Sequence, residues 1–422
     1  MKEKEIVMKI KDLRAHRIFD SRGVPAVECE LILDNGSSYR ASSPSGKSRG
    51  KAEAVEKRDG GNSFAGMDVT GVIYTIEHTI LNAIKGVAPE FITIDTLLCE
   101  LDGTENKSHL GANALLPVSI AVLRAQAALE GIAPYELIAH ATHNALVGLP
   151  MPMFNVINGG VHTNNSLSIQ EFMVIPRGAS HYATAIEGGL TVYQALKNIL
   201  IKDGKSVAVG DEGGFAPVLK DEHEALDYLM RAIDVATKIH GFEFNIALDM
   251  ASSEWYSPNT TLYTYQGKQY DNAELIDMYA TWCNEYPIIS LEDGLAQSDW
   301  IGWQQLTKRL GDRICLVGDD IFATNADLIY EGIELSVGNG VLIKPNQRGT
   351  VTETLQSIML CNQYERVVQI SHRSGETNDT FIADLAVGVK APFIKAGAPA
   401  RGERIAKYNR LLELEELLMM SE

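Results

Sequence analysis

The sequence has few cysteines, no surplus of positive charge and no long apolar run. Its five cysteines form no Cys-x-x-Cys pair, and their odd number and scattered spacing favour buried thiols in a reducing compartment. The net charge of −18 argues against non-specific binding to nucleic acid or an anionic membrane, so an anionic substrate would need a local cationic site. No run reaches the roughly 18 apolar residues of a spanning helix. The first residues, MKEKEIVMKIK, lack the apolar core of a signal peptide. We therefore expect a soluble, cytoplasmic protein.

The chain divides into two parts with different patterns. In the first, apolar and acidic residues alternate over Val27–Leu33, which predicts a half-buried strand, and residues 69–130 follow a mostly helical pattern. A break near Leu146–Pro152 precedes short apolar runs separated by helical stretches. The length of 422 residues allows one to three domains. We predict an N-terminal α+β capping domain over residues 1–145 and a catalytic barrel domain over residues 146–422.

Eight short apolar runs in the second part fit the strands of a closed β/α barrel. The first two runs are separated only by residues 159–170, which is too short for a crossover helix, so these two strands are predicted to pair antiparallel. Helices are predicted at His223–Ile239, Asn325–Glu334 and Thr352–Gln363, and the C-terminal residues read as an amphipathic packing helix. The eight runs are MFNVIN, EFMVIP, NIALD, IISLED, CLVGDD, VLIK, VVQIS and PFIK.

Carboxylates close three consecutive runs of this barrel, at Asp249, Glu292 and Asp319. Side chains at the carboxyl ends of parallel barrel strands converge on one rim, where the chemistry of such barrels takes place. A single acid at a strand end could instead cap the next helix. Three acids directed at one point need a divalent cation, and an all-oxygen ligand set favours Mg²⁺ over zinc.

Further charged groups follow on neighbouring segments. Lys344 ends the next run, and beside a bound cation its pKa would fall, so that the neutral amine could act as a base. The alternative is a salt bridge with one of the carboxylates. Glycine-bearing loops present Glu212 in GDEGGFAP and His162 in INGGVHTNN, and Glu171 begins a strand. Taken alone, the acidic loop is better explained as an ordinary turn, and a lone histidine on a loop is more often incidental than catalytic.

The segment SHRSGET brings together His372, Arg373 and Ser374. Arginine offers a planar fork that suits phosphate or carboxylate, and with Lys395 this group could hold a doubly anionic substrate. A surface patch of salt bridges is the alternative. A metal site, a lysine base, a carboxylic acid and an anion clamp together fit proton abstraction alpha to a carboxylate, with the metal stabilising the dianionic enolate.

These residues resemble those of the enolase family over nearly the whole chain, from Phe19–Gly23 to Arg404–Leu412. Long motifs in a shared order are far more specific than a shared fold. The resemblance implies a hydro-lyase that uses Mg²⁺ to dehydrate 2-phosphoglycerate to phosphoenolpyruvate in glycolysis, and at least a homodimer. The motifs include LDGTENKSHLGANA, NVINGGVH, QEFMVIP, VGDEGGFAP, LDMASSE, SLEDGLAQSDW, LVGDDIFATN, LIKPNQRGT, SHRSGET and GAPARGERIAKYN.

The resemblance also implies a role for each matching residue. Lys344 resembles the base that takes the C2 proton, and Glu212 resembles the acid that assists loss of the C3 hydroxyl, with Glu171 beside it. Ser48 lies where the family's mobile loop supplies a ligand to the second magnesium. The ligands of the first magnesium are matched by Asp249, Glu292 and Asp319, and the substrate contacts by His162, His372, Arg373, Ser374 and Lys395.

Departures from the family pattern add positive charge near the expected site. The mobile loop reads SGKSRG instead of SGASTG, which introduces Lys47 and Arg49, and NQRGT introduces Arg348. Drift at solvent-facing positions is one explanation, and a more negatively charged substrate or a different second-metal arrangement is another. Three readings stay open: an enolase, a paralogue acting on another phosphorylated or phosphonylated carboxylate, and a non-catalytic binding scaffold.

Overall fold

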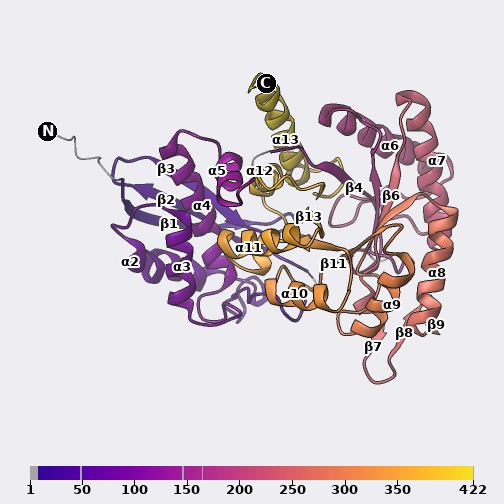
Figure 1. Cartoon of the computed structure of the whole chain (residues 1–422), viewed down its shortest axis with the longest axis horizontal. Coiled ribbons are helices and arrows are strands. Elements are labelled where there is room, and N and C mark those ends of the chain that lie inside the picture. The colour runs from indigo at the N-terminus through magenta and orange to yellow at the C-terminus, as the bar shows by residue number, and fades with distance from the viewer. Residues whose placement is uncertain (1–7, 48–49, 145–146, 164, 422) are drawn as a thin grey trace.

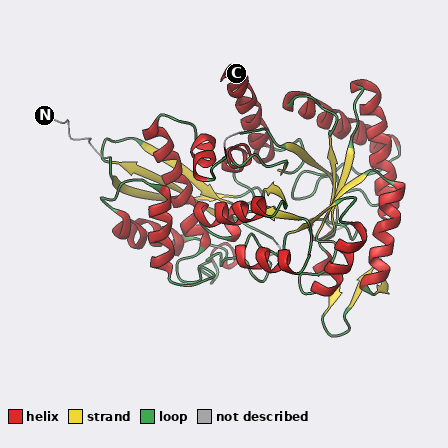
Figure 2. Cartoon of the chain, viewed as in Figure 1, coloured by secondary structure: helices red, strands yellow, loops and turns green. Residues whose placement is uncertain are grey.

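A computed structural model describes residues 8–47, 50–144, 147–163 and 165–421 of the chain. Figure 1 shows an N-terminal part, in indigo and purple, beside a barrel surrounded by helices. Figure 2 shows the same view by secondary structure, with the barrel strands converging inside a ring of helices. The predicted boundary between residues 145 and 146 lies outside the described residues.

Three antiparallel strands form the sheet of the N-terminal part. In the middle strand the apolar side chains from Val27 to Leu33 are buried at every second position, whereas Glu28 and Glu30 are partly exposed. The predicted half-buried strand is therefore confirmed. The sheet order is β1 (Ile10–Phe19), β2 (Pro25–Leu33) and β3 (Ser38–Ser43).

Helices fill the stretch between residues 69 and 130, as predicted. The longest, α4 (Ala112–Glu130), lies against β2 and β3. Among the described residues it is the one helix long and apolar enough to cross a membrane by length and composition, yet 78% of its apolar window is buried inside the protein. It is therefore the core helix of this part. The others are α1 (Thr70–Tyr74), the π-helical turn η2 (Thr75–Ile80), α2 (Leu81–Ile84), α3 (Phe91–Asp102) and α5 (Pro134–Ala141).

All eight predicted barrel strands are present and close into a barrel, which confirms the α/β fold class with an α+β domain preceding an eight-stranded β/α barrel. Most side chains of these strands are buried. Around the barrel the order is β10 (Ile288–Glu292), β11 (Cys315–Gly318), β12 (Gly340–Ile343), β13 (Val367–Ser371), β14 (Phe393–Lys395), β4 (Met151–Asn158), β5 (Glu171–Ile175) and β6 (Asn245–Asp249).

The second barrel strand runs against its neighbours. β5 pairs antiparallel with β4 and with β6, which confirms the prediction from the short connection after β4. The register places Glu171 opposite both Asn158 and Asp249. Because β5 is reversed, its first residue lies at the rim where its neighbours end. A strand-start glutamate therefore joins the strand-end carboxylates.

Eight helices of the described chain follow the barrel strands, and the predicted ones are confirmed within one or two residues. Asp221 caps α7, since its carboxylate accepts the backbone N–H of Glu224 at 3.0 Å, and the buried Leu226, Leu229 and Ile233 form one face. The helices are α6 (Tyr182–Lys202), α7 (Glu222–His240), α8 (Asn272–Glu285), α9 (Trp300–Leu310), α10 (Ala326–Glu334), α11 (Val351–Gln363), α12 (Phe381–Gly388) and α13 (Gly402–Ser421).

The C-terminal helix has the predicted packing role. Leu411 and Leu414 of α13 are fully buried, and the helix lies against α12 and α6. The carboxylate of Glu415 accepts the backbone N–H groups of Tyr182 and Ala183 at 2.5 and 2.9 Å. Because these are the first N–H groups of α6, one acid of α13 caps the neighbouring helix.

A small antiparallel sheet after β6 is absent from the sequence prediction, because its strands are too short to show a period of two. Its tyrosines hold the starts of two outer helices. Tyr263 donates its hydroxyl to Asp299, the N-cap of α9, at 2.8 Å, and Tyr265 donates to Glu222 at 2.7 Å. The strands are β7 (Tyr256–Ser257), β8 (Leu262–Tyr265) and β9 (Lys268–Tyr270).

A buried acid lies where the N-terminal part meets the barrel. Asp95 on α3 is 1% exposed, and its Oδ2 accepts the backbone N–H and the hydroxyl of Thr352 on α11, at 2.8 and 2.7 Å. Burial raises the pKa of Asp95 to about 6, against the hydrogen bonds from Ser119 and Thr352 that lower it. The native state therefore binds this proton more tightly than the unfolded chain does.

Because the pKa of Asp95 is higher in the folded protein than in the unfolded chain, we predict that Asp95→Asn increases the free energy of unfolding by an amount that depends on pH. The free energy of unfolding of the parent should fall as pH rises from about 4 to about 6 and stay lower above that range. The amide oxygen of asparagine can still accept the bonds from Thr352 without burying a charge. We expect the variant to be more stable than the parent by up to about 3 kcal/mol at pH 7.5 and by less at pH 5. Thermal unfolding of parent and variant at both pH values measures this difference in stability. An equal difference at pH 5 and pH 7.5 would contradict the prediction.

Candidate active site

Charged side chains from several barrel strands meet at one end of the barrel. Asp249 and Glu292 are the last residues of β6 and β10 and lie opposite one another in the strand register. Asp319 follows β11, Lys344 follows β12 and Lys395 ends β14. Among the predicted site residues that the structure describes, all except Glu292 line one cavity at this rim, namely His162, Glu171, Glu212, Asp249, Asp319, Lys344, His372, Arg373, Ser374 and Lys395.

The ammonium group of Lys395 is the centre of the first set of carboxylates. Its Nζ lies 3.0 Å from Glu171 Oε1, 3.1 Å from Asp249 Oδ2 and 2.8 Å from Glu292 Oε2. Burial works against the charge, but the surrounding carboxylates outweigh it and raise the pKa of Lys395 well above its usual value. The contact places Lys395 among the acids, although the sequence associates it with Arg373 in an anion clamp.

Lys344 and Asp319 form a second, shorter ion pair. Lys344 Nζ lies 2.5 Å from Asp319 Oδ2, and Gln347 donates to Asp319 Oδ1 at 2.9 Å. Burial opposes the charge of Lys344, but Asp319 outweighs burial, so in this arrangement the pKa of the lysine is raised rather than lowered. The salt-bridge alternative for Lys344 is the arrangement observed.

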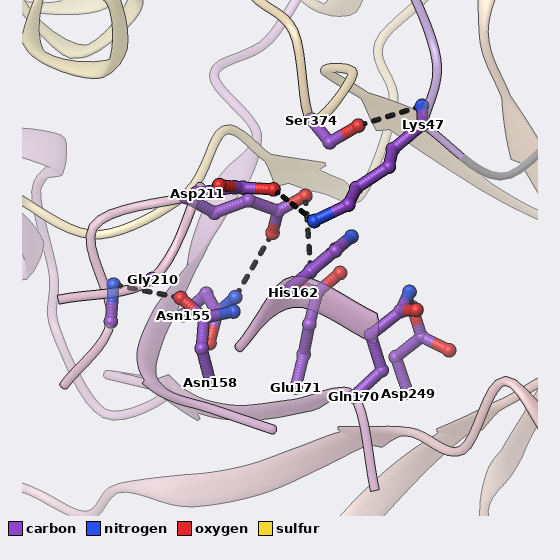
Figure 3. Close-up of polar contacts among 12 residues, drawn as sticks. Lys47, Asn155, Asn158, His162, Gln170, Glu171, Gly210, Asp211, Asp249 and Ser374 are labelled. Carbon is purple, nitrogen blue, oxygen red and sulfur yellow. Dashed lines mark hydrogen bonds and ion pairs between the residues drawn. The ribbon is translucent and has the colours of Figure 1, made fainter. Parts of the chain in front are cut away.

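Glu212 lines the same cavity and lies between two histidines. Its carboxylate accepts a hydrogen bond from Asn155 Nδ2 at 3.0 Å and lies 3.4 Å from His372 Nε2 and 3.8 Å from His162 Nδ1. Burial lowers the pKa of His372 to about 3 and also lowers that of His162, so both rings are neutral near pH 7. Figure 3 shows this part of the cavity, with the side chains of Asn155, His162 and Glu171 drawn as sticks.

Close packing explains the glycines beside Glu212. A Cβ added to Gly210 would lie 2.8 Å from Asn158 Cβ, and one added to Gly214 would lie 2.8 Å from Asn158 Oδ1. Asn158 Oδ1 accepts the backbone N–H of Gly214 at 3.0 Å. The glycines therefore let this loop approach β4, and the approach sets Glu212 at the rim.

Arg373 and Ser374 close another side of the cavity. Arg373 Nη1 donates to Glu53 Oε2 at 2.8 Å and to Asn346 Oδ1 at 3.1 Å, and Ser374 Oγ accepts the backbone N–H of Lys47 at 3.0 Å. Glu53, which comes from the N-terminal part, was not identified from the sequence. It lies in a loop without strand-end or motif features, so no local signal marks it.

Two acidic groups have the chemistry of a metal site. Oxygen atoms of Asp293, Asp319 and Asp320 lie within 4.8 Å of one another, and ligand atoms of His162, Glu171 and Glu212 do so as well. Glu171 Oε2 and Gln170 Oε1 are buried without a hydrogen-bond partner. The predicted trio of Asp249, Glu292 and Asp319 shares the same rim, although Lys395 and Lys344 occupy its oxygens. An oxygen-rich, partly unsatisfied rim fits a hard cation such as Mg²⁺.

The structure describes two of the three added cations, Lys47 and Arg348, and they lie in different surroundings. Arg348 Nη2 lies 3.1 Å from Glu353 Oε1, which also binds Lys107 Nζ at 2.9 Å. Arg348 lies on the loop after Lys344 but is not among the cavity-lining residues, so its charge is not part of the cavity wall. Its side chain forms an ion pair with Glu353 in the first turn of α11. Ser48 and Arg49 lie outside the described residues.

Removal of the Lys395 ammonium should leave buried carboxylates without a partner. We expect Lys395→Met to lower the free energy of unfolding by about 3–5 kcal/mol in a chelating buffer. Added Mg²⁺ should stabilise this variant more than the parent, because a cation can replace the lost charge. Denaturant titrations with EDTA and with Mg²⁺ measure both effects. The exposed Lys51→Met serves as the control, and a Lys395 variant as stable as this control would contradict the assignment.

Comparison with protein-family models agrees with this arrangement. The model of the enolase N-terminal domain matches residues 10–138. The model described as the enolase C-terminal TIM barrel domain matches residues 146–421, which include all the cavity-lining residues of the barrel. Together the two matches cover nearly the whole chain, and the protein belongs to the enolase family.

Proposed function

We propose that the protein is a Mg²⁺-dependent hydro-lyase that dehydrates 2-phosphoglycerate to phosphoenolpyruvate. The observation that carries the proposal is that two groups capable of proton transfer, Lys344 and Glu212, line one cavity with a carboxylate-rich rim. Membership of the enolase family supports the same reaction type. A cytoplasmic location, a role in glycolysis and a homodimer are parts of the proposal that rest on the family.

The chemistry needs a base on one side of the substrate and an acid on the other. Lys344 Nζ takes the proton from C2, and the C–H electron pair stays on the substrate as an enolate. In a second step this pair forms the double bond as the C3 hydroxyl, protonated by Glu212, leaves as water. Lys344 must first lose a proton, so its contact with Asp319 has to be exchanged. Mg²⁺ held by Asp249, Glu292 and Asp319 would supply positive charge against the negative charge developing on the substrate carboxylate.

Glu212 and Glu171 together form the acidic side. Ligand atoms of the two carboxyl groups lie within 4.8 Å of each other. Burial, followed by repulsion from Glu212, raises the pKa of Glu171 well above its usual value. Two buried carboxylates this close share one proton more cheaply than they ionise together. Against the effect of burial, His372 and His162 lower the pKa of Glu212 well below its usual value, so the proton of the pair rests on Glu171 in this arrangement. Glu212 must take over this proton before it can deliver it to the departing hydroxyl.

The cationic side chains and the serine would orient the substrate. Arg373 and Ser374 lie side by side in sequence at the cavity wall and suit a phosphate or carboxylate. The neutral His162 and His372 can each accept or donate one hydrogen bond without adding charge. Lys395 supplies positive charge among the acids of the rim.

A second candidate is a paralogue that acts on another phosphorylated or phosphonylated carboxylate. It is favoured by Lys47, whose ammonium adds a cation beside the cavity next to Gly46. The first candidate function is tested directly by measuring whether the purified protein converts 2-phosphoglycerate to phosphoenolpyruvate in the presence of Mg²⁺. The retained Lys344, Glu212 and strand-end acids argue against a non-catalytic scaffold.

Loss of one rim carboxylate should weaken metal binding. We expect Asp319→Asn to abolish activity and lower Mg²⁺ affinity by more than about tenfold, since even residues that only support metal ligands cost about 10–100-fold. Calorimetry of Mg²⁺ binding, with Asp327→Asn on the exposed start of α10 as control, measures this. Parent-like Mg²⁺ affinity in Asn or Gln variants of all three acids would rule out the metal assignment.

Isotope exchange should distinguish the role of Lys344 as the base from that of Glu212 as the acid. We expect Lys344→Ala to lose exchange of the substrate C2 proton with deuterated solvent by at least about 10²-fold. Glu212→Gln should keep that exchange while losing net dehydration, because abstraction precedes departure of the hydroxyl. Nuclear magnetic resonance of 2-phosphoglycerate follows both, with Lys308→Ala on α9 as control. Retained exchange in the lysine variant would refute its role as base.

A further inference from the structure

Lys47 connects the N-terminal part to two loops of the barrel rim. Its Nζ lies 2.9 Å from Asp211 Oδ2, and its backbone N–H donates to Ser374 Oγ at 3.0 Å (Figure 3). Asp211 immediately precedes Glu212, and Ser374 immediately follows Arg373. One residue therefore contacts the loops that carry the acid and the anion-binding arginine.

The wall segment Ser45–Lys47 is fixed at both ends. Ser45 and Gly375 exchange two backbone hydrogen bonds, with N···O distances of 2.9 and 3.0 Å. Arg22 Nη2 also donates to Ser45 Oγ at 2.8 Å. Gly46, between the two anchors, lines the cavity. Displacement of this wall segment would therefore open one side of the cavity.

Arg404 holds in place the two residues that Lys47 contacts, Asp211 and Ser374, and its own side chain is fully buried. Its Nη2 donates to the carbonyl oxygens of Asp211 and Ser374 at 3.1 and 2.8 Å, and its Nη1 donates to Arg373 O at 2.7 Å. A planar guanidinium fixes the relative positions of the groups it binds. By contrast, the Lys47 side chain is 42% exposed and that of Asp211 is 27% exposed. The solvent-accessible part of this connection is therefore the ion pair.

We propose that Lys47 is a positioning residue that latches the wall segment to the barrel rim through Asp211 and so controls access to the cavity. The proposal deepens the proposed function and rests on it for its kinetic consequences. Because the pair is partly exposed, its loss should change the opening equilibrium by about twofold to fivefold. Salt should weaken the latch, because exposed charges are screened.

Hydrogen exchange of the Ser45 amide in the full chain without substrate tests the latch independently of activity. We expect Lys47→Met and Asp211→Asn each to speed this exchange about twofold to fivefold at low salt. The double variant should be no faster than either single variant, because both remove one interaction. Lys51→Met, four residues further on, should match the parent. Parent-like exchange in Lys47→Met, or additive effects in the double variant, would overturn the proposal.

Steady-state kinetics with 2-phosphoglycerate and Mg²⁺ test the consequence for access. We expect Lys47→Met to raise KM about twofold to fivefold with a smaller change in kcat, and to reduce the dependence of KM on KCl concentration. Lys51→Met should keep the parent's KM and salt dependence. An unchanged KM in an active Lys47→Met enzyme would overturn the role in access. Failure of the parent to turn over 2-phosphoglycerate would instead count against the proposed function, and hydrogen exchange would still decide the latch.

Discussion

The rim depends on one buried ammonium group. Lys395 is 2% exposed and contacts carboxylates from β5, β6 and β10, which could not be buried together without a compensating charge. Its strand, β14, lies on the far side of β4 and β5 from β6 in the barrel order. Charges from opposite sides of a closed barrel therefore meet inside it. The barrel must close for this site to exist.

The reversal of β5 is the second constraint on the site. A parallel β5 would bring its last residue, Ile175, to the rim, whereas the antiparallel strand brings its first residue, Glu171. Glu171 then lies near both Glu212 and Lys395. The short connection after β4 thus determines which residue type reaches the site. Loop length has a chemical consequence here, because it places a carboxyl group beside the acidic side of the cavity.

Sequence patterns predict the parts of the site that follow from strand periodicity. The eight barrel strands, the acids at their ends and the antiparallel β5 are all confirmed as structure, because each follows from spacing along a single segment. Contacts between distant loops have no such signal. Arg373 binds Glu53 across 320 positions, and Lys47 binds Asp211 across 164. Arg348 shows the same limit, since this cation follows Lys344 closely in sequence but pairs with Glu353, and neither residue lines the cavity.

The cations of the cavity are already paired with carboxylates, in a protein of net charge −18. Lys344 is paired with Asp319, and Arg373 is paired with Glu53. An anion binding alone would take the cations and leave buried carboxylates unpaired, and a cation binding alone would leave the lysine and arginine unpaired. Either outcome carries the large cost of an uncompensated buried charge. If the proposed anionic substrate and divalent cation bound together, both costs would be avoided, because each would take the partners that the other releases. For the proposed reaction, the ion pairs would therefore couple the two binding events.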